Sequence, residues 1–332
     1  MTKHAAERGV YSALFSRSMA YIQTPRGKQT AQPRRGGRGK DMELKRTAGA
    51  LIPENGLPAE QAEDAARVLI LGGLDAGADA FLAGETVKSR MQAQDLLVSA
   101  LDQAGPSQIR WLQDAQADLI ALAALRGAQS TPALPDGMQS IGIGESEAMA
   151  NRPYIRCVNG IRLGFVSLAE QPLGAFNARA DILHLAAYDR VRMLLSQCDH
   201  VIVLVHSGPG EGMLPLPEWR ERYRRFVDAG ASIVADTGRA KGWESYQNGL
   251  VFYGLGSPAE ADSLGIFLTL QRNGRFSYEA HALQYAAGTL DFSSNDAFRA
   301  KIDAQNRLFT DETAYLRAAD DMCEELYCKS EP

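Results

Sequence analysis

Three short apolar runs lie in the second half of the chain, at residues 201–205, 231–235 and 250–253. Each is rich in β-branched or aromatic side chains and has the length of a buried strand. Between the first two runs, apolar side chains recur at helical spacing over residues 217–230, a segment that ends on a glycine. A strand, a helix and a strand in this order predict a parallel α/β unit.

Further elements are predicted on both sides of this unit. Asn-Gly pairs at 159–160 and 273–274 stand between apolar runs, and each predicts a β-hairpin because Asn-Gly tolerates the positive φ angles of a tight turn. Residues 92–104 are predicted as an amphipathic helix closed by Gly-Pro. Residues 297–326 carry helical patterning and many charges. The predicted fold class is therefore α/β.

Polar side chains follow the predicted strands at the point where each strand stops. His206 and Ser207 come after the first run, and Asp236 comes directly after the second. In open α/β sheets, ligands bind in the loops at the carboxyl ends of the strands. We therefore take these three residues as candidate site residues. A hydrogen-bonded structural histidine is the alternative interpretation of His206.

The charge of the chain is unevenly spread. Residues 1–50 contain eleven Lys or Arg against three acidic residues, whereas the remainder has a net charge of −13. The first segment is rich in Arg, Gly, Pro and Gln and has no apolar face, which predicts a disordered basic arm. A solvated tail or non-native upstream residues are the alternatives to a functional arm. We expect an α/β domain over residues 51–290 and a helical appendage over residues 291–332.

Several stretches resemble the CapA family of bacterial capsule-synthesis and poly-γ-glutamate-synthesis proteins. The family's strand ending in His–aromatic–Gly is similar to VIVLVHSG, its "AGAD-V-V" strand to DAGASIVADTG, and its "I-F-Y-S-L-G-N" turn to GLVFYGLGSP. Upstream, residues 141–170 resemble the family's segment with the pattern P-x-I-x-x-V-N-G-V. Order and spacing agree over residues 141–258, roughly a third of the chain.

The resemblance implies a metallophosphoesterase-like αββα sandwich with mixed sheets. It also implies a two-metal hydrolytic site, in which several His, Asp or Asn ligands make a metal-bound water nucleophilic near neutral pH. Asp75, His206 and Asp236 are the residues that could hold a divalent metal such as Mn, Fe or Zn. A turn-forming role is the alternative for Asp75, because the family's Gly-Asp pair is absent there.

The chain departs from the family at most of the metal-ligand motifs. Where the family has a His-x-x-His loop, this sequence reads ADTGRAKGWES, so Arg239 and Lys241 stand in place of imidazoles. Cations repel a divalent metal and favour an anion such as phosphate or carboxylate. We therefore predict a divergent member of the family for which no cofactor is certain. Ser207, Arg239 and Lys241 are its predicted ligand-binding residues. His206 and Asp236 are its catalytic candidates.

The leading functional hypothesis is a role in capsule, exopolysaccharide or poly-γ-glutamate-type polymer biosynthesis without the two-metal site, as a pseudoenzyme. Two alternatives stay open: an active metal-dependent phosphoesterase or amide hydrolase with rearranged ligands, and a non-enzymatic scaffold or binding protein. The expected partners are an anionic small molecule or polymer and polymer-biosynthesis proteins, rather than nucleic acid.

No run of about 18 apolar residues is present, so we expect no integral membrane segment. The expected location is cytoplasmic, with a periplasmic or membrane-associated location as alternatives. The four cysteines are sparse and lack CxxC spacing, which predicts neither a disulfide framework nor a zinc site.

Overall fold

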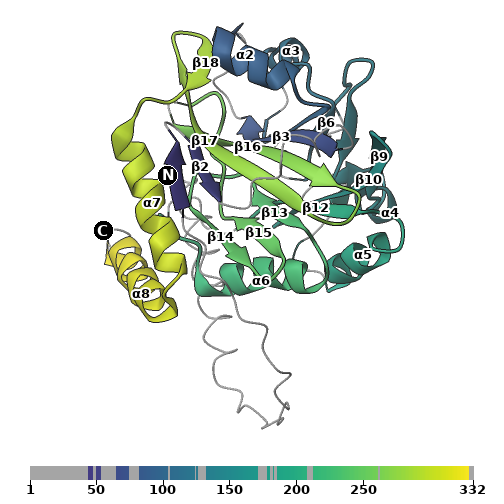
Figure 1. Cartoon of the computed structure of the whole chain (residues 1–332). Helices are drawn as coiled ribbons and strands as arrows, with labels where there is room; N and C mark the ends of the chain where they lie inside the picture. The colour runs from purple at the N-terminus through teal and green to yellow at the C-terminus, as the bar shows by residue number, and fades with distance from the viewer. Residues whose placement is uncertain are drawn as a thin grey trace, which may run out of the picture. The chain divides into compact units, whose positions relative to one another are not determined.

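The computed structural model describes the chain from residue 65 to residue 328, with short gaps (Figure 1). The gaps are 75–81, 104, 124, 126–131, 171–177, 180–181, 183–184, 208–211 and 261, and the backbone of 44–47 and 50–53 is also described. Among the described residues, no helix combines the length and the apolar content needed to cross a bilayer. Cys157, Cys198 and Cys323 are free thiols.

The first sheet is mixed and holds the predicted C-terminal hairpin. Its strands in spatial order are β1 (Leu44–Thr47), β2 (Ala50–Pro53), β17 (Phe276–Ala286), β16 (Ser263–Gln271), β3 (Ala65–Leu74), β5 (Leu96–Leu101), β6 (Leu119–Ala121) and β7 (Gln139–Ile141). β18 (Thr289–Phe292) pairs with β17 and with β4 (Leu82–Ala83). β16 and β17 are antiparallel around Asn273 and Gly274, which confirms that hairpin.

The second sheet contains the predicted strand–helix–strand unit. Its strands in spatial order are β14 (Trp243–Tyr246), β15 (Gly249–Phe252), β13 (Ile233–Asp236), β12 (His200–His206), β10 (Ile161–Ala169) and β9 (Tyr154–Val158). β12 pairs with β13 in parallel, and α6 (Pro217–Asp228) connects them. β9 and β10 form the hairpin predicted from Asn159 and Gly160, which have φ angles of 50° and 76°.

The two sheets pack face to face and helices cover their outer faces, which confirms the αββα sandwich with mixed sheets. Ile70 and Val98 of the first sheet share one buried core with Phe165 and Ile202 of the second. The outer face of the first sheet is covered by α2 (Glu85–Gln92) and α3 (Pro106–Asp114). The outer face of the second packs against α5 (Ala186–Leu194), α6 and α8 (Glu312–Cys328).

The prediction of a helix over residues 92–104 is wrong. Helix α2 ends at Gln92, and β5 follows as a strand whose six residues are all buried. A parallel strand covered on both faces has no alternating polar positions. Its apolar run therefore cannot be told from one face of a helix by periodicity alone.

Both ends of the described chain join the sandwich. Residues 1–43 of the predicted basic arm lie outside the described residues, and the boundary predicted at residue 50 falls within the antiparallel hairpin of β1 and β2. Leu51 of that hairpin pairs with Ala280 of β17, a partner too remote in sequence for local composition to reveal. The predicted C-terminal helices are α7 (Asp296–Phe309) and α8, and Phe298 and Ile302 of α7 reach the core between the sheets. A minor pair, β8 (Ile143–Gly144) and β11 (Ala178–Arg179), follows β7, and the short helix α4 (Glu147–Ala150) comes after β8.

Candidate functional site

Strands from both sheets end at one common edge. The peptide N–H of Gly73, in β3, donates a hydrogen bond of 2.8 Å to the carbonyl of Thr237, directly after β13. This bond joins the carboxyl end of a strand in the first sheet to that of a strand in the second. We call the residues gathered here the strand-end site: Asp102, His206, Ser207, Asp236, Thr237, Arg239 and Lys241.

His206 ends β12 with its side chain 23% exposed. Its Nδ1 lies 3.3 Å from the hydroxyl of Thr237 and 3.8 Å from a carboxylate oxygen of Asp102. The imidazole therefore lies between Thr237, which follows β13 of the second sheet, and Asp102, which follows β5 of the first, while part of its surface stays open to solvent.

Asp102 is a site residue that the sequence reasoning missed. It directly follows β5, so it occupies the same strand-end position as His206 and Asp236. The usable signal is a carboxylate just past a buried apolar run, and it is hidden because that run also fits the pattern of a helix. Gly73 makes room for this carboxylate, since a Cβ there would lie 2.6 Å from both Asp102 oxygens.

Asp236 is buried, and both of its carboxylate oxygens accept hydrogen bonds. Oδ2 accepts from the hydroxyl of Tyr223 on α6, and Oδ1 accepts from the peptide N–H of Gly238 at 2.6 Å. Ser207 Oγ lies 2.7 Å from the same tyrosine oxygen. Because Tyr223 gives its one hydroxyl proton to the carboxylate, Ser207 is the donor in that contact. Burial, followed by the Asp236 charge, raises the pKa of Tyr223 well above its ordinary value.

Replacing Tyr223 with phenylalanine is expected to lower the free energy of unfolding by about 1–3 kcal/mol, because a buried carboxylate oxygen of Asp236 then loses its donor. Tyr246→Phe is the matched control, since that hydroxyl accepts one bond from the exposed Gln247. Urea unfolding of both variants measures the difference. Equal, small losses in the two variants would show that Asp236 does not depend on Tyr223.

Lys241 is the buried cation of the strand-end site. The residue is only 6% exposed, and no salt bridge joins it to a carboxylate of the described residues. Burial lowers the pKa of its amine, the charges of Arg239 and Lys301 lower it further, and Asp236 opposes the shift. A buried cation among other cations is unfavourable unless an anion compensates it.

The loop that carries Arg239 and Lys241 is fixed by glycines and by α7. A Cβ on Gly254 would lie 1.8 Å from the carbonyl oxygen of Arg239, so only glycine allows this approach. The peptide N–H of Trp243 donates to Asn306 Oδ1 of α7 at 2.7 Å. The exposed Arg239 and the buried Lys241 are thus presented on a backbone with little freedom.

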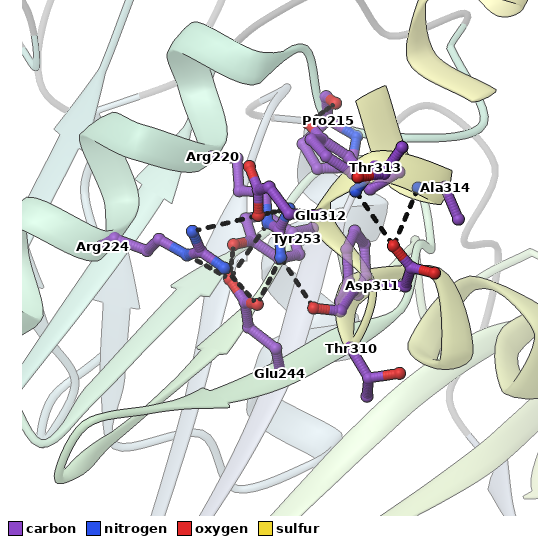
Figure 2. A network of polar contacts seen from close by, with 12 residues as sticks. Pro215, Arg220, Arg224, Glu244, Tyr253, Thr310, Asp311, Glu312, Thr313 and Ala314 are labelled. Atoms are coloured by element: carbon purple, nitrogen blue, oxygen red, sulfur yellow. Dashed lines mark hydrogen bonds and ion pairs between the residues drawn. The ribbon is translucent and has the colours of Figure 1, made fainter. Parts of the chain in front are cut away.

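A second polar cluster, shown in Figure 2, connects α6 to β14. Arg220 and Arg224 of α6 both contact Glu244 of β14, with nitrogen–oxygen distances between 2.8 and 3.3 Å. Arg220 also donates to the carbonyl of Phe309 at 2.8 Å and to Glu312 at 3.0 Å. These bonds tie the turn between α7 and α8 to the second sheet, so the cluster is structural.

The described residues do not fit a metal pair. No group of three His, Cys, Asp or Glu side chains suited to a metal ion occurs among them. Asp236 already uses both oxygens, and Lys241 lies within its electrostatic reach. Asp75, predicted as a metal ligand, lies outside the described residues. The structure therefore brings His206, Ser207, Asp236, Arg239 and Lys241 to one edge but offers no ligand set for a metal pair in the described part of the chain.

Solved structures are similar to this chain over about two thirds of its length. A hypothetical protein from Thermus thermophilus is 15% identical, and the match covers 66% of this chain and 100% of that one with a TM-score of 0.42. Wild-type Vps29 complexed with zinc, from Entamoeba histolytica, is 9% identical, with 68% and 97% covered and a TM-score of 0.30. Among curated proteins, none matches.

The family described as bacterial capsule synthesis protein PGA_cap matches residues 104–259. This range contains β12, α6, β13 and the loop bearing Arg239 and Lys241, which is the part of the chain where the family resemblance was noted. Over this segment, slightly less than half of the chain, the sequence is similar to the family of bacterial capsule synthesis proteins.

Proposed function

We propose that this protein acts in the synthesis of a capsule, exopolysaccharide or poly-γ-glutamate-type polymer by binding an anionic group at the strand-end site. Lys241 and Arg239 supply the positive charge, and His206 and Ser207 supply further polar contacts. In this proposal the site does not hydrolyse its ligand with two metals. The family match supports the general role, and the chemistry of the site supports the mode of action.

The observation that carries the proposal is the burial of Lys241 without a salt bridge to a described carboxylate. An ammonium group in that environment is stabilised by an incoming anion, because the anion replaces the hydration that burial removed. Arg239 adds a planar guanidinium that can hold two oxygens of a phosphate or carboxylate at once. The same two cations disfavour a divalent metal.

Calorimetric titration with inorganic phosphate, pyrophosphate and short glutamate oligomers tests the proposal. We expect saturable binding of at least one anion, which weakens as ionic strength rises because the interaction is electrostatic. Polymer levels in a strain lacking the gene are expected to fall. Absence of binding for all three probes, together with unchanged polymer, would overturn the proposal.

An active metal-dependent hydrolase is the second candidate, and the approach of Asp102 to His206 is the observation that favours it. A histidine and a carboxylate from different strands can share a cation. This candidate requires near-stoichiometric Mn, Fe or Zn in protein purified without chelator, and loss of that metal in His206→Ala. We expect elemental mass spectrometry to find sub-stoichiometric metal in the wild type and in His206→Ala. Near-stoichiometric metal in the wild type that is lost in His206→Ala would favour the hydrolase.

A further inference from the structure

A cavity of about 380 Å³ lies between the C-terminal ends of α2 and α3. It is lined by Leu97, near the start of β5, and by Asp118, directly before β6. The cavity is therefore at the amino ends of these parallel strands, whereas Asp102 of the strand-end site follows the carboxyl end of β5. Its volume lies within the range of about 300–1,000 Å³ that small-molecule sites occupy.

Helix α3 ends at this cavity with a residue that its backbone conformation disfavours. The peptide N–H of Gln116 donates to the carbonyl of Gln113 at 3.0 Å. That of Ala117 donates to the carbonyl of Leu112 at 2.9 Å. These two bonds form a helix-ending motif that usually has glycine at its left-handed position. Gln116 occupies that position with a φ of 58°, whereas the same motif at the end of α6 has Gly230 there.

The side chain of Gln116 lacks the local contact that explains another glutamine in the same conformation. Gln247 has a φ of 50°, and its amide donates to Asp228 at 2.6 Å. The Gln116 amide instead lines the cavity and has no hydrogen-bond partner among the described residues. Asp114, the last residue of α3, places an exposed carboxylate where the helix dipole favours a cation. Departures from local preference concentrate at functional sites, so this helix end is a candidate binding surface.

The side chains that line the cavity indicate the class of ligand. Amide groups, each offering a donor and an acceptor, come from Gln92, Gln94 and Gln116. Two carboxylates against one lysine give the lining a negative balance, which disfavours an anion. The floor is aliphatic, and no described lining residue is aromatic, so a flat ring has no stacking partner. A neutral ligand with many hydroxyls and an apolar face fits this combination.

We propose that this cavity binds a neutral saccharide unit. Its hydroxyls contact the amides and carboxylates, and its C–H face packs on the aliphatic floor. Sugar hydroxyls both donate and accept hydrogen bonds, as amide side chains do, and they also donate to carboxylates. The cavity and the strand-end site lie at opposite ends of β5, so this inference does not depend on anion binding by the proposed function.

Ligand-observed NMR on the full chain tests the site, with glucose, galactose, N-acetylglucosamine, maltose and N,N′-diacetylchitobiose as probes. We expect saturable binding of at least one saccharide, which pyrophosphate does not displace. Gln116→Gly is expected to weaken binding by about fivefold or more, as loss of one hydrogen bond implies. The same change is expected to raise Tm by about 1–3 °C, because glycine adopts the left-handed conformation without strain.

Gln247→Gly is the matched control, since it makes the same change in the same backbone conformation outside the cavity lining. We expect its affinity to stay within about twofold of the wild type, as for an independent site. Asp114→Asn is a second test variant, and it is expected to weaken binding without loss of stability, because its carboxylate opposes the helix dipole.

The outcomes decide both the site and its ligand. Weaker binding in Gln116→Gly and Asp114→Asn, with unchanged binding in Gln247→Gly, supports the cavity as the saccharide site. Unchanged affinity in both test variants would overturn its location. No saturable binding of any saccharide would show a solvent-filled groove only, and tighter binding of N-acetylglycinamide than of the sugars would overturn the ligand class. Pyrophosphate titration of the wild type reports separately on the proposed function.

Discussion

Replacing Glu244 with alanine is expected to lower the free energy of unfolding by about 3–5 kcal/mol. The carboxylate accepts bonds from Arg220, Arg224 and the hydroxyl of Tyr253. Arg220 is 1% exposed, so removal of Glu244 leaves a buried guanidinium whose remaining salt bridge among the described residues is with Glu312. Desolvation of such a charge is what makes the loss large.

Glu221→Ala is the matched control for this prediction. Glu221 lies on the same helix as the two arginines and pairs with Arg225 at 3.2 Å, but its side chain is 58% exposed. We expect its removal to change stability by less than about 1 kcal/mol, as for other surface pairs. Urea unfolding of both variants provides the comparison, and equal effects would mean that the buried cluster does not stabilise the fold.

The same carboxylate predicts a dependence of stability on pH. Burial by itself would raise the pKa of Glu244, but the bonds from Arg224, Arg220 and Tyr253 outweigh it and hold its pKa below the ordinary value of 4.5. A depressed pKa contributes stability that is complete above the ordinary value and is lost as the pH falls through the folded-state value. The wild type is therefore expected to lose stability more steeply below about pH 4.5 than Glu244→Ala.

Replacing Lys241 with methionine is expected to weaken anion binding by about 100-fold while the ligand-free protein becomes more stable. The loss of affinity follows from removing a desolvated, charge-assisted donor. The gain in stability follows because methionine fills a similar volume and removes a buried cation from the field of Arg239 and Lys301. We expect the gain to be roughly 1 kcal/mol.

Opposite signs for stability and binding make this prediction specific. A purely structural lysine would give a less stable variant, and a lysine without a role in the site would leave binding unchanged. Lys88→Met, which removes an exposed lysine from α2, is the control for general loss of positive charge. Urea unfolding and pyrophosphate titration of the two variants measure both quantities.

The sequence by itself determined most of the second sheet. Strands β12 and β13 and helix α6 are contiguous segments whose periodicity reflects burial directly, and the turn at Asn159 and Gly160 follows from local backbone preferences. The same local patterns placed His206 and Asp236 at strand ends, which is how they became candidates, whereas Lys241 became one because it stands where the resembled family has its His-x-x-His loop.

Only the tertiary structure decided how residues from separate segments meet. Asp102 was missed because β5 is buried on both faces, so its apolar run gave no period by which to identify a strand. The bond from Tyr223 to Asp236 and the influence of Lys301 on Lys241 join elements that are far apart in sequence. Such contacts depend on how the sheets and α7 pack, and the distances between packed elements are not encoded in the pattern of any one segment.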